Sequence, residues 1–224
     1  MSGYLFLRIK QIIHETPEAA TFVLENISGK KVPYKAGQFL TFIFNRHGKE
    51  ARRSFSLSSA PGIDKHLSVT VKRLDNGEFS RYMLSSLNEG DVLKSLYPAG
   101  RFTFDETCKG PADVFLLAAG SGIVPVFSIL KQILQTRPDL RVTLIYSNYS
   151  ESSIIFREVL RKLEKAHSGF RCIHILSHPE RQAADARQGH LNNRQLELLV
   201  RDHMRFPKER ALFFICGPFT YMRM

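Results

Sequence analysis

The chain has 224 residues, of which 43% are hydrophobic and 24% are charged, and its formal net charge is +11. This composition is ordinary for a folded protein and excludes a disordered chain, while the length allows one large domain or two smaller ones, of which we prefer two. Because the positive charge is scattered and forms no basic arm, we expect no nucleic acid or membrane partner, and favour an anionic cofactor or an acidic protein.

The N-terminal stretch MSGYLFLRIKQIIHE is interrupted by Arg8 and Lys10, so it lacks the continuous apolar segment of a signal peptide. Cys108, Cys172 and Cys216 are few and far apart, which supports neither a disulfide framework nor a metal site. We therefore expect no bound metal and a reducing, cytoplasmic location.

Short β-rich runs separated by turn residues make up the first part of the chain. In the run LSVTVK, Leu67, Val69 and Val71 alternate onto one face, and one helix is expected over residues 79–87. Further β-rich runs are residues 39–44 and 54–58. We predict an N-terminal antiparallel β-barrel or sandwich over residues 1–108.

After the plausible linker Lys109-Gly110-Pro111, buried strands alternate with helices. The strands are VFLLAA, RVTLIYS, FRCIHIL and ALFFIC. The helix near Ile155 places Ile155, Val159 and Leu163 at four-residue spacing, and the helix after Asn192 has a plausible cap with Gln195 three residues on. Such alternation predicts an α/β doubly wound parallel sheet over residues 109–224.

The most apolar stretch, LLAAGSGIVPVFSIL, could be a membrane span, a buried helix or a phosphate-binding turn. Gly120, Gly122 and Pro125 interrupt it, which argues against the first two, so we predict a strand, a turn and a helix that begins at Pro125. In a doubly wound sheet this first turn is where a pyrophosphate meets a helix N-terminus. A glycine turn with a purely structural role remains the alternative, since the third glycine of G-x-G-x-x-G is replaced.

The stretch RRSFSLSS at residues 52–59 has two interpretations. In the structural one, Phe55 and Leu57 face the core of a strand and Arg53 is a solvated charge. In the functional one, Arg53 binds a phosphate, Phe55 offers a ring face and Ser56 offers a hydroxyl.

Five motifs occur in the order and spacing of the ferredoxin-NADP reductase family, which the chain resembles over nearly its whole length. The motifs are RSFS at 53–56, VKRLDNGEFS at 71–80, YPAGRF at 97–102, GSGIVP at 120–125 and ICGP at 215–218. The chain is most similar to the branch in bacterial aromatic-compound oxygenase reductases, in particular the phenylacetyl-CoA epoxidation type. In that branch a C-terminal 2Fe-2S domain usually follows, and we expect no such cluster within these residues, because they contain no plant-type C-x-x-x-x-C-x-x-C run.

The resemblance implies an FAD site on the barrel. Arg53 would bind the flavin pyrophosphate, Phe55 would replace the family's usual Tyr against the isoalloxazine, and Ser56 would be a catalytic residue near flavin N5. The other FAD-binding residues it implies are Ser54, Val71, Lys72, Gly77, Phe79 and Ser80. From the residues alone, Ser80 could still be only a helix cap.

The resemblance also implies a nicotinamide-nucleotide site on the parallel sheet. Cys216 would lie beside the nicotinamide as the second catalytic residue, without nucleophilic chemistry, although an ordinary buried thiol is the alternative. The other NAD(P)-binding residues it implies are Gly120, Ser121, Gly122, Pro125, Ser147, Asn148, Gly217 and Pro218. Tyr149 and His178 stand where arginines for an NADPH 2′-phosphate would be sought, with Arg181 as a possible substitute, so NADPH is slightly favoured over NADH.

The expected activity is hydride transfer from NAD(P)H to FAD, followed by single-electron transfer to an iron-sulfur domain or protein that serves an oxygenase. The alternatives are a ferric or flavin reductase with a diffusible acceptor, and a flavin-binding fragment without turnover. Family members continue beyond the C-G-P motif, whereas this chain ends at Met224. We therefore expect the nucleotide-binding domain to be truncated at its C-terminus and the helix begun at Gly217 to be cut short.

Overall fold

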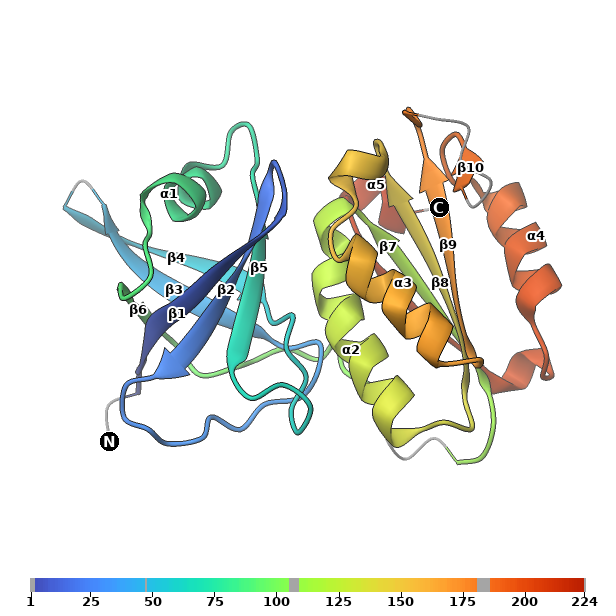
Figure 1. Ribbon diagram of the computed structural model, residues 1–224, viewed down its shortest axis with the longest axis horizontal. Coiled ribbons are helices and arrows are strands. Elements are labelled where there is room, and N and C mark those ends of the chain that lie inside the picture. Colours follow the sequence, from blue (N-terminus) through green and yellow to red (C-terminus); the bar gives the residue numbers. More distant parts are fainter. Residues whose placement is uncertain (1–2, 47, 105–108, 181–185, 224) are drawn as a thin grey trace.

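The computed structural model describes residues 3–46, 48–104, 109–180 and 186–223. Two lobes lie side by side, each built around its own β-sheet (Figure 1). One sheet is antiparallel and has six strands, and the other is parallel and has five. Among the described residues, no helix is both long and apolar enough to cross a membrane.

The antiparallel sheet has the strand order β4-β3-β6-β1-β2-β5. Its strands are β1 (Leu5–Thr16), β2 (Ala19–Asn26), β3 (Phe39–Arg46), β4 (Lys49–Ser56), β5 (Leu67–Lys72) and β6 (Val92–Ser95). A bridge between Leu57 and Val69 joins the two outermost strands, which curls the sheet into a barrel. Helix α1 (Glu78–Ser86) covers the barrel with Phe79 and Met83 buried, so the predicted barrel and its one helix are confirmed.

The parallel sheet has the strand order β10-β9-β8-β7-β11. Its strands are β7 (Asp113–Ala119), β8 (Arg141–Asn148), β9 (Phe170–Leu176), β10 (Ala186–Gln188) and β11 (Ala211–Cys216). Its helices are α2 (Ile123–Thr136), α3 (Arg157–Ala166), α4 (Asn193–His203) and α5 (Phe219–Met222). Side chains of α2 and α3 pack on one face and those of α4 and α5 on the other, which confirms the doubly wound arrangement.

Several element boundaries differ from those predicted. Helix α2 begins at Ile123, which places Pro125 within its first turn, where a missing backbone N–H costs no hydrogen bond. Helix α3 begins only at Arg157 because Phe156 has a left-handed φ of 63°. The stripe of Ile155, Val159 and Leu163 is therefore wrong as a buried helix face: Ile155 precedes the helix and Val159 is 42% exposed.

The C-terminal elements were predicted only in part. The run ALFFIC forms a strand as expected, but β11 lies at the sheet edge rather than in its interior, and Phe213 is 53% exposed. Helix α5 begins at Phe219, after Gly217-Pro218, not at Gly217. The predicted cap of α4 is confirmed, since the Asn192 side chain accepts a hydrogen bond from the Gln195 backbone N–H.

Helix α2 lies between the two sheets and joins them (Figure 1). The Ser128 hydroxyl accepts a hydrogen bond from the Gly37 backbone N–H at 3.2 Å and donates one to the Ser59 carbonyl oxygen. Lys131 forms an ion pair with Asp64 of the barrel. The two buried hydrogen bonds of Ser128 and the partly exposed ion pair of Lys131 fix how the barrel faces the parallel sheet.

Candidate functional site

The glycine turn predicted from the sequence lies between β7 and α2. Gly120–Gly122 form one 3₁₀ turn, and the backbone N–H groups at the start of α2 have no side-chain cap. Gly120 has a φ of +52°, and a Cβ added there would meet nothing within 4 Å. The turn is therefore open to solvent at a helix N-terminus, which is the geometry that binds a phosphate.

Tyr146 on β8 holds this turn, although no sequence motif pointed to it. Its hydroxyl donates a hydrogen bond to the Gly120 carbonyl oxygen at 3.1 Å, and its side chain is fully buried. Its only sequence signal was an aromatic residue at the end of an apolar strand. Such a buried anchor fixes a turn whose glycines would otherwise leave it flexible.

The other glycine of the turn makes a close contact with the end of β11. A Cβ on Gly122 would lie 2.2 Å from the Cys216 carbonyl oxygen and 2.7 Å from the Gly217 nitrogen. Only glycine at position 122 therefore allows the turn and the Cys216-Gly217-Pro218 segment to lie side by side. Burial raises the pKa of the Cys216 thiol, so the neutral thiol is the form present near neutral pH, in agreement with a non-nucleophilic role.

Ser147 and Asn148 lie at the carboxyl end of β8, next to this turn. The Ser147 hydroxyl and both polar atoms of the Asn148 amide are buried without a hydrogen bond of regular geometry to another described residue. The nearby Ser147 hydroxyl opposes the burial that raises the pKa of Tyr221 to about 12. The Asn148 amide likewise opposes the burial that raises the pKa of Tyr146. Because these buried atoms have only poorly aligned protein partners, they fit a ligand that supplies hydrogen bonds of regular geometry.

On the barrel, the end of β4 presents a cation above an aromatic ring. The Arg53 guanidinium lies 4.5 Å from the centre of the Phe79 ring and donates one hydrogen bond, to the Arg52 carbonyl oxygen. Arg53 is exposed, so its remaining N–H groups are available to an anion. Phe79 belongs to the first turn of α1, whose N-cap Gly77 provides no side-chain cap.

The remaining candidate residues of β4 differ in whether their side chains already have hydrogen-bond or packing partners within the protein. The Ser54 hydroxyl is hydrogen-bonded to Thr41 at 2.9 Å, and the half-buried Phe55 ring packs on Phe42 with centroids 5.8 Å apart. The Ser56 hydroxyl is half-buried and has no hydrogen bond to any described residue. Of these side chains, Ser56 is thus the one whose polar group is free to meet a ligand.

Ser80 is engaged within its own loop. Its hydroxyl donates to the Gly77 carbonyl oxygen at 3.0 Å and accepts from the Leu74 backbone N–H at 3.2 Å. A Cβ on Gly77 would lie 2.5 Å from this hydroxyl. The hydroxyl therefore shapes the loop, and the donors available to a pyrophosphate are the backbone N–H groups of the first turn of α1.

The fold brings the candidate FAD-binding residues of the barrel close to the candidate nucleotide-binding residues of the parallel sheet. The Leu57–Val69 bridge connects the end of β4 to β5, and β5 lies against Gly120–Gly122. Val71 is buried in the barrel core, and Lys72 is half-buried beside it at the end of β5. The end of β4, strand β5, the glycine turn and the end of β11 therefore contact one another in this order across the junction of the lobes.

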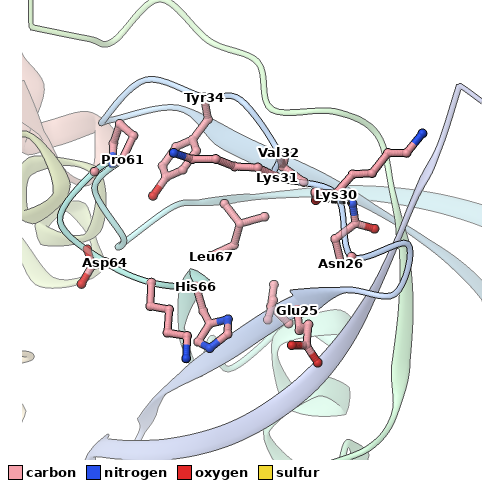
Figure 2. Close-up of a pocket in the computed structure, with 14 residues that line it drawn as sticks. Glu25, Asn26, Lys30, Lys31, Val32, Tyr34, Pro61, Asp64, His66 and Leu67 are labelled. Atoms are coloured by element: carbon pink, nitrogen blue, oxygen red, sulfur yellow. Dashed lines mark hydrogen bonds between the residues drawn. The ribbon is translucent and has the colours of Figure 1, made fainter.

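A separate hollow lies on the barrel, away from these residues. Figure 2 shows it lined by basic, acidic and apolar side chains, among them Lys30, Lys31, Asp64 and Leu67, and its volume is about 290 Å³. No residue assigned to FAD or to the nucleotide lines it. It therefore plays no part in the candidate site.

The region expected to select between NADPH and NADH contains stacked rings. Tyr149 and His178 follow the ends of β8 and β9, and their ring centroids are 4.3 Å apart with an interplanar angle of 22°. Tyr149 is 61% exposed. Arg181 lies outside the described residues.

An antiparallel barrel whose strand ends meet the glycine turn of a doubly wound parallel sheet defines the class of two-lobed flavin- and nicotinamide-dependent oxidoreductases. Residues 6–104 match the family model of the oxidoreductase FAD-binding domain, and residues 116–224 match that of the oxidoreductase NAD-binding domain. The chain belongs to the ferredoxin reductase family and carries FAD- and NAD(P)-binding domains.

Named relatives agree with this assignment. The chain is 30% identical to one of the subunits of the 1,2-phenylacetyl-CoA epoxidase of Escherichia coli strain K12, over 99% of this chain and 62% of that protein. It is 34% identical to the ferredoxin reductase component of 3-ketosteroid-9-alpha-monooxygenase of Rhodococcus rhodochrous, over 99% of this chain and 59% of that protein. The chain thus spans about three fifths of the length of these relatives.

The fold also matches a solved structure. A ferredoxin NADP+ reductase from Neisseria gonorrhoeae, with bound FAD and NADP, superimposes with a TM-score of 0.83. The match covers 100% of this chain and 89% of that one at 23% identity, a level at which the likeness concerns the fold. The predicted pairing of an antiparallel barrel with a doubly wound sheet is confirmed.

Proposed function

We propose that this chain is the NAD(P)H-oxidising part of an oxygenase reductase. The observation that carries the proposal is the contact of β5 with the glycine turn, which itself lies against Cys216 at the lobe junction. Bound FAD would supply the redox chemistry, accepting a hydride from the nicotinamide and releasing electrons one at a time. The chain's own residues bind the two cofactors and align them.

We assign the flavin side to the barrel residues. Arg53 and the first-turn N–H groups of α1 would hold the pyrophosphate through charge-assisted and backbone hydrogen bonds. Phe55 would pack against the flavin ring, and the free Ser56 hydroxyl would donate to a ring nitrogen. The engaged hydroxyl of Ser80 would act through the loop that it shapes. The other residues of this proposed site are Ser54, Val71, Lys72, Gly77 and Phe79.

We assign the nucleotide side to the parallel sheet. The open turn at Gly120 and Ser121 would bind the nucleotide pyrophosphate, and Ser147 and Asn148 would donate to and accept from the bound nucleotide. Cys216 would line the nicotinamide position with a neutral thiol. The other residues of this proposed site are Gly122, Pro125, Gly217 and Pro218. NADPH remains slightly favoured, because Tyr149 and His178 both carry hydrogen-bond donors.

The electron acceptor that we propose is an iron-sulfur domain or protein, followed by an oxygenase of aromatic or phenylacetate-type degradation. Its support is that both relatives named above are components of oxygenase systems, together with the net charge of +11, which would attract an acidic partner. We propose a boundary between residues 108 and 109. We also propose a cytoplasmic location, which is consistent with Cys172 and Cys216 as free thiols.

The test is an acceptor comparison with the FAD-loaded chain. NAD(P)H oxidation is measured with a plant-type 2Fe-2S ferredoxin, with a ferric complex and with free flavin, each over a series of salt concentrations. We expect the ferredoxin to be reduced fastest, and its rate to fall as salt screens the attraction between the two proteins. A faster, salt-independent rate with the ferric complex or free flavin would instead indicate a diffusible acceptor.

A further inference from the structure

A second hollow lies at the opposite end of the parallel sheet from the glycine turn. It has a volume of about 620 Å³ and opens where β8 and β9 begin. These strands have eight and seven residues, so at about 3.3 Å per residue the hollow is roughly 20 Å from their carboxyl ends. Neither proposed cofactor site extends to it.

Three arginines line this hollow, and most of their guanidinium N–H groups donate no hydrogen bond to another described residue. Arg141 donates one long hydrogen bond, 3.4 Å, to the Ser168 carbonyl oxygen. Arg171 lies 3.4 Å from a Glu164 carboxylate oxygen that also accepts from the Cys172 backbone N–H. Arg205 has no side-chain partner among the described residues. Since each guanidinium carries five N–H donors, the three together leave a large surplus.

The position of Arg205 is fixed by a buried carboxylate. Asp113 is 2% exposed, and one of its oxygens accepts hydrogen bonds from the backbone N–H groups of Arg205 and Phe206, both at 2.8 Å. The two bonds hold the segment that enters the hollow after α4. The backbone of Arg205 is therefore held in place where its residue lines the hollow, and Phe206 forms an apolar part of the wall.

His203, at the end of α4, also lines the hollow, and the positive charge of the neighbouring arginines affects its pKa. Its pKa is lowered first by burial and then by Arg171 and Arg205, with a further lowering from Arg187 and an opposing effect of Asp202. Among the described residues that line the cavity, Arg141 and Glu164 are the other charged groups. Asp113 does not line it but is bonded to the backbone of Arg205 and Phe206. The arginines outnumber the carboxylates, so the hollow carries a net positive charge that disfavours protonation of the His203 imidazole and lowers its pKa.

We propose that this hollow is an anion site that binds a dianionic phosphate group through Arg141, Arg171 and Arg205. The planar guanidinium fork matches two phosphate oxygens at once, which a lysine ammonium cannot do. Glu164 limits the positive charge and orients Arg171. The group is either free phosphate or the phosphate of a monoester, and it binds independently of FAD and of the nicotinamide nucleotide.

The test follows the His203 imidazole by proton–carbon NMR while the full chain is titrated with inorganic phosphate at constant ionic strength. His203→Gln identifies the resonance. We expect a saturable shift and a rise in the His203 pKa, because a bound anion cancels the field of the arginines. A linear shift without saturation would overturn the proposal.

Variants separate a built site from general charge attraction. Arg205→Gln is expected to weaken phosphate binding at least tenfold, and Arg205→Lys, which keeps the charge but not the fork, about threefold. Lys31→Gln removes one charge from the barrel hollow of Figure 2 and should leave phosphate binding within twofold. Equal weakening by all three variants would overturn the proposal, provided that their melting temperatures match the parent's.

A second titration with glycerol phosphate distinguishes the source of the phosphate. Tighter binding of the monoester would assign the site to phosphorylated small molecules, and tighter binding of inorganic phosphate would assign it to the free ion. If neither ligand shifts the His203 resonance, the hollow is not a phosphate site. Because neither titration involves FAD or NAD(P)H, its failure leaves the proposed function untouched.

Discussion

Replacing Gly122 by alanine tests whether the contact between the glycine turn and β11 aligns the cofactors. The φ of Gly122 is −61°, so alanine adopts the backbone without strain. Its Cβ, however, would lie 2.2 Å from the Cys216 carbonyl oxygen and 2.5 Å from its carbonyl carbon. Since both are backbone atoms, the turn and the end of β11 must separate by more than an ångström.

The size of the effect follows from this displacement. Overpacking of this kind costs about 1–3 kcal/mol of unfolding free energy. A misplacement of about 1 Å between reacting groups lowers a rate about 100-fold. We therefore expect Gly122→Ala to retain FAD, whose proposed site is on the barrel, and to transfer hydride about 100-fold more slowly at saturating NAD(P)H.

The assay is anaerobic stopped-flow measurement of flavin bleaching, with thermal unfolding measured in parallel. Gly120→Ala is the matched control: its φ of +52° costs alanine about 1–2 kcal/mol, yet its Cβ points into open space. The control should weaken NAD(P)H binding and leave the saturated rate within a few-fold of the parent's. A parental rate for Gly122→Ala, or equal losses of rate in both variants, would refute the proposed alignment.

Arg53→Ala should weaken FAD binding about 10- to 100-fold in a dialysis titration, because a charge-assisted hydrogen bond of about 1.5–3 kcal/mol is lost; unchanged retention would remove Arg53 from the site. Ser56→Ala should keep FAD and slow hydride transfer, and a parental stopped-flow rate would contradict its role. Burial raises the pKa of Glu15, which accepts a hydrogen bond from Thr21. The protonated Glu15 carboxyl therefore favours the folded state at a pH below the pKa of this group in the unfolded chain. This contribution to the free energy of unfolding is lost as the pH rises through the raised pKa of the folded chain. Glu15→Gln should therefore be more stable than the parent at neutral pH, with the difference vanishing in acid; a pH-independent difference in melting temperature would contradict this.

Much of the fold could be predicted because local patterns and burial agreed. The alternation of Leu67, Val69 and Val71 predicted a barrel strand, and all three side chains are buried in the barrel core. The cap at Asn192 depends on two residues of one helix turn and was predicted correctly. The start of α3 was not, because the left-handed Phe156 is held by stacking on Phe127 of α2, with ring centroids 4.2 Å apart.

Periodicity, turn chemistry and an ordered set of motifs were enough to predict the two-lobe architecture, the glycine turn and the residue types of both candidate sites. Tertiary structure alone decided which of these residues meet. The contact of Gly122 with Cys216 joins positions 94 residues apart, and the hydrogen bond from Tyr146 to Gly120 joins β8 to the turn after the neighbouring strand β7. The three arginines of the second hollow come from β8, β9 and the segment after α4. Spacing along a chain cannot reveal such encounters, because they depend on how the strands order themselves in the sheet and on which strand ends share an edge.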